Sequence, residues 1–307
     1  MRRTSLSPRV AAILLGCLSL SPTLSFSQTG DLRTLPESAP GNVDTPSPVP
    51  SAASAGGSQV EHPYGFRQIG LDTRYLVTRP AHLERNGIVK IALTAGTAGI
   101  LFLYREDIRD WVQDHRNPER DTMLYQVRIM GKGAFAPSLA LIAYGSSLIT
   151  KNPREKETSV LLLESMGFTG AATGIGQAIL ASQRPTEGTD VNLFARRGHG
   201  VSGDAALAAS VVPILNRQYL TLRPGDSGGA RFGKVSAAAL LYAGAFLTGY
   251  QRVNSDAHWA PDAFLGLVTG FSVGQMLCDS HQKTREESSR RVDFSAGTGV
   301  FQARISF

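Results

Sequence analysis

The sequence predicts an all-α fold. The apolar residues gather in six runs of helical length, all rich in Ala, Gly and Leu. The strict apolar–polar alternation of strands is lacking across residues 88–280. Small residues allow helices to approach closely, so we expect a six-helix bundle over this domain. The runs are Ile88–Tyr104, Ile129–Ile149, Thr158–Ser182, Asp204–Asn216, Val235–Tyr250 and Pro261–Leu277.

The first 27 residues are typical of an export signal. Three arginines in the first nine positions precede an apolar run, Val10–Leu20. Small residues then precede a plausible cleavage point before Gln28. The segment ending at Cys17 also resembles a lipoprotein box, so lipid attachment there is the alternative to ordinary cleavage.

Three segments flank the helical domain. Residues 28–63 are rich in Pro, Ser, Gly and Ala, which predicts a disordered linker because such a chain buries little apolar surface. Residues 64–87 have mixed composition, and we expect an amphipathic lead-in. The tail, residues 281–307, alternates around Gly297–Gly299 and predicts a short β-hairpin.

The net charge of +6 limits the partners. The basic residues are scattered, without a long basic run or interleaved aromatic residues, so no nucleic-acid groove is predicted. The positive charge instead favours anionic partners such as phosphate esters or acidic lipids. Cys17 and Cys278 are the only cysteines, and neither their number nor their spacing fits a metal site, so we expect no metal or other cofactor.

Three reactive residues stand together near the end of the domain. Arg252, His258 and Asp262 lie between two apolar runs. An arginine can hold phosphate oxygens through two parallel hydrogen bonds. A histidine can attack phosphorus, and a carboxylate beyond it can orient the imidazole. This spacing favours phosphate chemistry.

Two upstream segments, Gln177–Pro185 and Gly200–Asp204, complete a pattern. Together the three segments resemble the signature motifs of the PAP2 superfamily, which are Lys-x6-Arg-Pro, Pro-Ser-Gly-His and Ser-Arg-x5-His-x3-Asp. That superfamily holds type 2 phosphatidic acid phosphatases, bacterial class A acid phosphatases and vanadium haloperoxidases. The residues that match are Arg184, Pro185, Ser202, Gly203, Arg252, His258 and Asp262. The sequence departs from the pattern at Gln177 for Lys, Val201 for Pro, Asp204 for His and Gln251 for Ser.

The resemblance implies a metal-independent phosphatase that forms a phosphohistidine intermediate. It implies that His258 is the nucleophile and that Asp262 orients it. The groups implied to bind phosphate are Arg184, Arg252, Ser202 and the Gly203 amide, with Gln177 at the lysine position. All three motifs fall at helix ends, so antiparallel packing would bring them to one end of the bundle.

Asp204 replaces the histidine that would protonate the leaving alkoxide. An aspartic acid could do so only if it remained protonated; otherwise its charge would repel phosphate. His199, five residues earlier, is the alternative acid, and Gln177 can donate a hydrogen bond but lacks the lysine charge. The alternative to an enzyme is therefore a weak or inactive phosphate-binding envelope protein on the same fold. A vanadium haloperoxidase is a third class.

Location admits two interpretations. The basic loops Lys151–Lys156 and Arg217–Lys234 favour a membrane-integral form with these loops in the cytoplasm. Against this, a cleaved signal followed by six crossings places the motifs on the wrong side, and Glu164 interrupts the third run, so a soluble periplasmic bundle is the alternative. We expect an exported, membrane-associated protein.

The segment Gly225–Gly229 matches the sequence around the nucleophile of serine peptidases. The runs on either side of it are helical, whereas that peptidase fold is all-β, so we expect the segment to be a loop between two helices.

Overall fold

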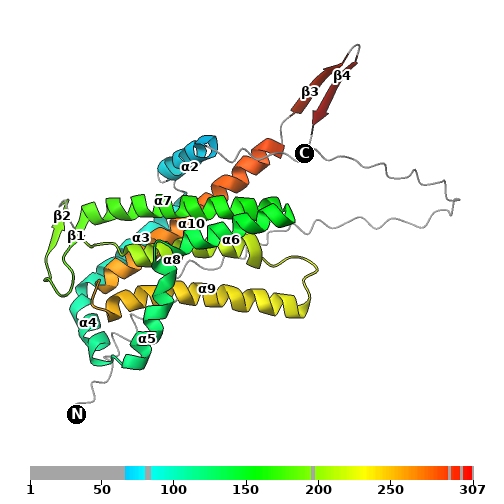
Figure 1. The fold of residues 1–307 in the computed structure, drawn as a ribbon. Coiled ribbons are helices and arrows are strands. Elements are labelled where there is room, and N and C mark those ends of the chain that lie inside the picture. Colours follow the sequence, from blue (N-terminus) through cyan, green and yellow to red (C-terminus); the bar gives the residue numbers. More distant parts are fainter. Residues whose placement is uncertain (1–65, 80–83, 195–197, 290–291, 298–299, 306–307) are drawn as a thin grey trace, which may run out of the picture.

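The computed structural model describes residues 66–79, 84–194, 198–289, 292–297 and 300–305, and it confirms the all-α fold (Figure 1). The predicted signal, with its Cys17 alternative, and the predicted linker lie outside these residues. The helices are α2 (Phe66–Thr78), α3 (Arg85–Leu103), α4 (Arg105–Asp114), α5 (Pro118–Val127), η2 (Arg128–Gly131), α6 (Phe135–Thr150), α7 (Pro153–Ile179), α8 (Gly203–Leu215), η3 (Asn216–Leu220), α9 (Gly228–Asn254) and α10 (Ala260–Ser289). The strands are β1 (Leu180–Ser182), β2 (Val191–Leu193), β3 (Val292–Gly297) and β4 (Val300–Ile305).

Each of the six predicted runs contains a helix, but the sequence did not predict every element. The third run was expected to stay helical to Ser182, whereas α7 ends at Ile179 and the chain continues as β1. Helix α4 was missed because most of its residues are charged and it buries only Ile108 and Val112, an i, i+4 pair too sparse to form an apolar run.

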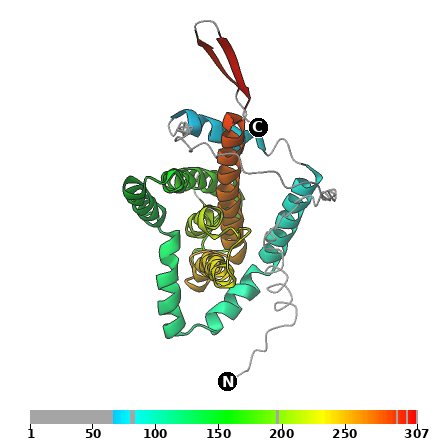
Figure 2. The same ribbon diagram turned by 90° about the vertical axis from the view of Figure 1, so that its right-hand side faces the viewer.

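The expected C-terminal hairpin is present. Strands β3 and β4 pair antiparallel, from Val292 opposite Ile305 to Gly297 opposite Val300. The expected amphipathic lead-in, residues 64–87, contains α2 and the start of α3. Helix α2 packs against α10, which runs through the middle of the molecule with other helices around it (Figure 2).

Alternate helices run in opposite directions. In Figure 1, α7 and α9 run toward the end that carries β1 and β2, whereas α8 and α10 start there and run away from it. The ends of α7 and α9 therefore lie near the starts of α8 and α10. This arrangement is the antiparallel packing expected to bring the three motifs together.

Helices α8 and α10 touch backbone to backbone. Three glycines spaced four residues apart on α10 face α8, where a side chain in place of their hydrogen would collide with backbone carbonyl oxygens. The pairs are Gly266 with Ser202, Gly270 with Ala206, and Gly274 with Ser210. Glycine is required along this face because no other residue leaves room for the facing backbone.

A small apolar cluster holds the third motif in place. Val253 and Ala263, which flank the loop between α9 and α10, are buried against Leu101, Ile108 and Val112 of α3 and α4. The missed helix α4 thus packs on the motif loop.

A larger cluster, between α6, α7, α8 and α10, buries Leu161 and Leu277 together with Cys278. Burial raises the pKa of the Cys278 thiol to about 12, so this thiol stays protonated and inert.

The segment Gly225–Gly229 forms a turn and a helix start, as expected. Gly225 has a φ of 92°, which glycine adopts without strain. The Ser227 hydroxyl accepts a hydrogen bond from Ala230 N and caps α9. Ser227 is therefore a capping residue.

Two described helices, α3 and α9, are long and apolar enough to cross a membrane. The pair formed by residues 118–131 and α6, bent by 59°, would add a third if it were one span. Helix α8, with 13 residues, is only about 20 Å long, whereas the hydrocarbon layer is about 30 Å thick. Membrane contact through α3 and α9 fits this composition.

The glycine face of α10 generates a stability prediction. Gly270→Ala should lower the free energy of unfolding by about 1–3 kcal/mol, because the new methyl group forces α8 and α10 apart. Gly174→Ala on α7 is the matched control, since a Cβ there meets no atom within 4 Å. Thermal unfolding followed by circular dichroism measures both, and equal melting temperatures would contradict the close contact.

Candidate active site

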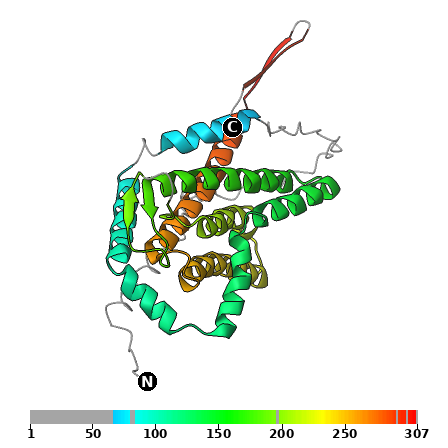
Figure 3. The ribbon, with the colours of Figure 1, turned by 60° about the vertical axis from the view of Figure 1, so that its left-hand side comes forward.

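Figure 3 shows the β1–β2 hairpin close to the start of α10. Backbone and side-chain hydrogen bonds join the three motif segments there. The His199 amide donates to the Ser182 carbonyl over 2.9 Å, and the Ser202 amide donates to the Asp262 carbonyl, also over 2.9 Å. The Ser182 hydroxyl donates to Asp262 Oδ2 over 3.1 Å. Residues far apart in the sequence therefore meet at one end of the bundle.

The small β1–β2 hairpin, missed by the sequence analysis, carries the first motif. Leu180 to Ser182 pair with Leu193 to Val191, and Arg184 follows directly on the connecting turn. The indole nitrogen of Trp259 donates to the Gln183 carbonyl over 2.9 Å. Gln183 is the first residue after β1, and Trp259 directly follows His258, so this bond fixes the hairpin to the chain just before α10.

His258 is held with one ring nitrogen engaged. Its side chain is 9% exposed, and Nδ1 lies 3.0 Å from the His199 carbonyl oxygen. A carbonyl only accepts hydrogen bonds, so Nδ1 carries the hydrogen and Nε2 keeps its lone pair. This is the tautomer that a nucleophilic Nε2 requires.

Asp262 does not make the expected hydrogen bond to His258. Asp262 Oδ2 lies 3.9 Å from His258 Nδ1, and it accepts instead from the Ser182 hydroxyl and, over 3.2 Å, from the Trp259 amide. The orienting acceptor for His258 is therefore the His199 carbonyl. Asp262 braces the junction between β1 and α10 and supplies a nearby negative charge.

Asp204 lies between two arginines. Its Oδ2 is 2.7 Å from Arg128 Nε and 3.4 Å from Arg252 Nη1. Arg252 is 11% exposed, and its Nε is buried without a hydrogen-bond partner. Asp204 Oδ2 therefore serves as the acceptor for guanidinium groups that come from two different elements. Of the two roles considered for Asp204, general acid fits this geometry poorly.

Arg128 is a site residue that the sequence analysis missed. It belongs to η2, where Gly131 lies against the Asp204 backbone so closely that a Cβ would collide with it. No motif contains Arg128, and only this packing places its guanidinium beside Asp204. Arg128 thus adds a second guanidinium group, besides that of Arg252, next to Asp204.

The remaining motif residues have distinct places. Gln177 Nε2 donates to the Val201 carbonyl over 2.8 Å, so it holds the second motif loop. The buried Ser202 hydroxyl accepts from Ala205 N and caps α8. The first amides of a helix have no acceptor within the helix. A Cβ on Gly203 would meet nothing within 4 Å, and the start of a helix is a common place for an anion to bind.

Two basic side chains near His258 are more exposed. Arg184 is exposed and makes no ion pair with the residues that the structure describes. His199 is half-buried, and its ring centroid lies 6.2 Å from that of His258. Burial, and then the positive charge of Arg184, lower the pKa of His199 below its ordinary value. His199 is therefore mostly neutral at neutral pH.

The loop that carries His258 is braced from α4 and α5. Asp256 has a φ of 58° and makes a bidentate ion pair with Arg109, with both contacts at 2.6 Å. The Asn254 side chain donates to Asp121 over 2.6 Å. These contacts turn the chain sharply between α9 and α10 and fix the backbone next to His258.

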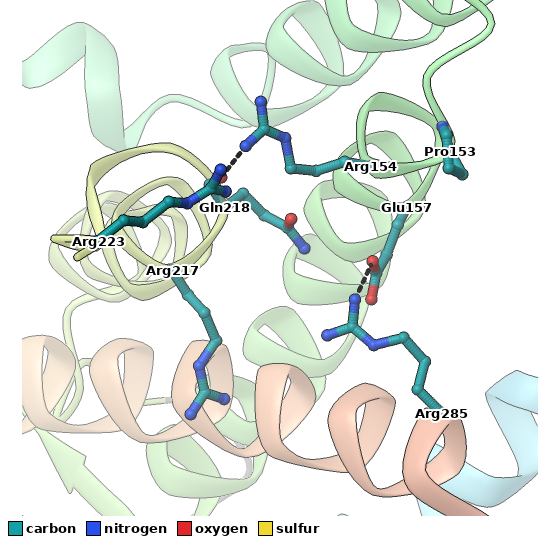
Figure 4. Close-up of a pocket in the computed structure, with 7 residues that line it drawn as sticks. All are labelled: Pro153, Arg154, Glu157, Arg217, Gln218, Arg223 and Arg285. Atoms are coloured by element: carbon teal, nitrogen blue, oxygen red, sulfur yellow. Dashed lines mark hydrogen bonds and ion pairs between the residues drawn. The ribbon is translucent and has the colours of Figure 1, made fainter. Parts of the chain in front are cut away.

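A separate cavity of about 290 Å³ lies elsewhere, where the start of α7 faces η3 and α10 (Figure 4). Three of its arginines have side-chain partners: Arg285 pairs with Glu157, Arg217 pairs with Asp279, and Arg154 donates to the Gln218 carbonyl. None of the motif residues contributes to it. Its lining residues are Pro153, Arg154, Glu157, Arg217, Gln218, Arg223 and Arg285.

Comparison with known proteins gives two similar structures. The first is the transmembrane PAP2 type phosphatidylglycerolphosphate phosphatase from Bacillus subtilis, with 15% identity, a TM-score of 0.44, and coverage of 71% of this chain and 98% of that chain. The second is Aquifex aeolicus LpxE, with 19% identity, a TM-score of 0.37, and coverage of 57% of this chain and 94% of that chain. No protein-family model and no curated protein matches the sequence. The function proposed below therefore rests on the site itself.

The position of Asp204 generates a binding prediction. Asp204→Asn should tighten binding of orthovanadate or phosphate by roughly three- to tenfold, because a half-exposed ion pair worth about 1 kcal/mol no longer competes for the guanidiniums. Titration calorimetry measures the change. The control is Asp279→Asn, which breaks the ion pair with Arg217 away from the site. Weaker binding in Asp204→Asn would contradict this role.

Proposed function

We propose that the protein is a PAP2-like phosphatase that hydrolyses phosphate monoesters or lipid phosphates or pyrophosphates. The observation that carries the proposal is the pairing of a free His258 Nε2 with an anion pocket in one place. Arg252 supplies a buried, unpartnered Nε, and the start of α8 supplies amides beside Gly203. A nucleophile and a phosphate receptor are the two parts that phosphoryl transfer needs.

The reaction would proceed in two displacements. His258 Nε2 attacks phosphorus and forms a P–N bond while the P–O bond to the alkoxide breaks, giving a phosphohistidine. Water then attacks phosphorus and gives one proton to a neighbouring imidazole, that of His199 after it has protonated the alkoxide; the P–N bond breaks, and phosphate leaves with His258 restored. Arg252, Arg184 and Arg128 would stabilise the charge on the phosphoryl oxygens in both steps.

The alkoxide must receive a proton when it leaves. Asp204 is engaged by Arg128 and Arg252, so we assign this role to His199, whose ring lies beside that of His258. The lowered pKa of His199 makes it a stronger acid than an ordinary histidine, and a bound phosphate dianion would favour its protonated form. Asp204 would hold the two guanidiniums in place until phosphate arrives.

We further propose that the protein is exported and acts at the periplasmic side of a membrane. Helices α3 and α9 have the length and composition of membrane spans, and α6 and α9 expose large apolar side chains such as Leu141 and Leu240. A membrane surface would bring lipid phosphates to the site. The assigned steps use only protein groups, so turnover should persist in excess chelator.

A non-catalytic phosphate-binding protein is the second candidate. Two observations favour it: Asp204 neutralises the arginines of the pocket, and Gln177 binds Val201 instead of adding a charge. Vanadate binding without hydrolysis of any phosphate monoester or phosphatidic acid would support this candidate. Appearance of activity in Asp204→His alone would support it strongly.

The central test is removal of the nucleophile. His258→Ala should lower turnover of an aryl phosphate and of phosphatidic acid by roughly 10⁴-fold or more, because no other group can form the covalent intermediate. Vanadate binding should be largely retained, since the arginines remain. His115→Ala is the control. His115 follows the last residue of α4, its ring contacts Trp111, and its carbonyl accepts from Arg120. Full activity in His258→Ala would refute the site.

The assignment of His199 generates a pH prediction. A general acid must be protonated, and the pKa of His199 lies below 6.5, so hydrolysis of alkyl phosphates should fall as pH rises through that lowered value. Aryl phosphates, with better leaving groups, should show a weaker decline. His199→Gln should slow alkyl phosphates and remove this limb of the pH–rate profile. An unchanged profile in the variant would exclude His199 as the acid.

A further inference from the structure

A second group of reactive side chains lies deep in the bundle, away from the motifs. Asp72 of α2, Glu164 of α7 and His281 of α10 meet there, and all three are buried. Glu164 precedes Ser182 by 18 residues and His281 follows Asp262 by 19. At the rise of an α-helix, each distance corresponds to roughly 27 Å along the chain. This cluster is therefore separate from the candidate active site.

The three residues converge on one point. His281 Nε2 lies 3.1 Å from Glu164 Oε2 and 3.3 Å from Asp72 Oδ2, and one ligand atom from each residue lies within 4.8 Å of the others. Ligand atoms that each lie about 2.0–2.2 Å from a shared metal ion are about 3–3.6 Å apart. The observed separations are close to this spacing.

The hydrogen bonding within the cluster is incomplete. A ring nitrogen carries at most one hydrogen, so His281 Nε2 cannot satisfy both carboxylates. The Asp72 side chain is fully buried, and its Oδ2 has no hydrogen-bond partner. Glu164 Oε1 is also buried without one. Buried carboxylate oxygens without donors are costly unless a cation binds them.

The surrounding residues orient these ligand atoms. Gln68 Nε2 donates to Asp72 Oδ1 over 2.9 Å, which leaves Oδ2 facing the other two residues. On the far side of the imidazole, Nδ1 lies 3.5 Å from Glu157 Oε1. Glu157 Oε2 in turn accepts from Arg285 over 3.0 Å (Figure 4). A histidine that binds a metal through one nitrogen commonly presents the other to a carboxylate.

The charges favour a divalent cation. Arg285 forms an ion pair with Glu157, whereas no Lys or Arg ion pair with Asp72 or Glu164 is present among the described residues. Two carboxylates and one imidazole therefore converge on one buried point. A divalent cation at that point would balance both carboxylates and give each of the three side chains a bond.

We propose that Asp72, Glu164 and His281 bind a divalent transition-metal cation that fastens α2 to α7 and α10. One imidazole nitrogen and two carboxylates suit Zn²⁺ or Mn²⁺ better than Mg²⁺ or Ca²⁺, which prefer oxygen ligands alone. The ion is structural, because no motif residue contacts the cluster in the part of the chain that the structure describes. The proposal does not depend on the phosphatase function.

Metal content tests the proposal directly. The full chain is stripped with chelator, incubated with Zn²⁺, desalted and analysed by elemental mass spectrometry. Wild type should retain about one Zn²⁺ per chain, and His281→Gln and Glu164→Gln should retain none. Glu157→Gln, which removes only the outer carboxylate, should weaken Zn²⁺ binding by roughly 10–100-fold.

Two controls exclude other histidines. His115→Gln removes a histidine distant from the cluster, and His258→Ala removes one at the motif site; both should retain the metal. Retention of Zn²⁺ by His281→Gln, or its loss in His258→Ala but not in His281→Gln, would overturn the proposal. So would a wild-type chain that retains no Zn²⁺ and no Mn²⁺, since the cluster would then hold protons only.

Two readouts on the wild-type chain decide the matter even where a variant fails to fold. Co²⁺ added to stripped protein should give visible absorption bands of a nitrogen–oxygen site, and Zn²⁺ should abolish them. Trypsin cleavage after the exposed Arg74 of α2 should slow when Zn²⁺ is added. Absence of the Co²⁺ bands and equal cleavage with and without Zn²⁺ would both refute the site, and neither readout uses turnover.

Discussion

The contact between α8 and α10 determines where every motif residue lies. The glycine face of α10, beginning at Gly266, lets the α8 backbone approach so closely that the Ser202 amide reaches the Asp262 carbonyl. That hydrogen bond sets the start of α8 beside the start of α10. The first amides of α8 thus lie next to the loop that carries His258 and leads into α10. A bundle packed at the usual interaxial distance of 8–10 Å would separate them.

The electrostatics of the motif end follow from this packing. Arg128 and Arg252 come from different elements and would repel each other if they faced each other alone. Asp204, in the first turn of α8, lies between them and also interacts favourably with the positive end of the helix dipole. A phosphate at the same place would supply the same negative charge with more acceptor oxygens. On the proposed function, the Asp204 carboxylate would stand where a phosphate oxygen binds, and its charge offsets those of the two guanidinium groups.

Sequence patterns predicted the parts of this structure that depend on local periodicity. The six apolar runs, the C-terminal hairpin and the meeting of Arg252, Ser202 and the Arg184 segment at one end were all foreseen from spacing and helix direction. Contacts set by tertiary packing were not. Nothing local marks Arg128 as a neighbour of Asp204, because η2 reaches α8 only through the close approach of Gly131. Asp262 was expected to orient His258, and packing places a second acceptor there: the His199 carbonyl oxygen, 3.0 Å from His258 Nδ1, lies nearer than the carboxylate at 3.9 Å.

Glu164 weakens the interpretation of the third run as a membrane span, and it supports the proposed cation site. In the sequence it was a charge that interrupted an apolar helix, and it argued against a membrane span. In the structure the charge faces inward, where Asp72 and His281 surround it. A carboxylate in that position costs several kcal/mol unless a cation or a proton balances it. Helices α7 and α10 thus carry buried polar residues along their inner faces. Among the described helices, α3 and α9 have the length and apolar composition that a bilayer requires.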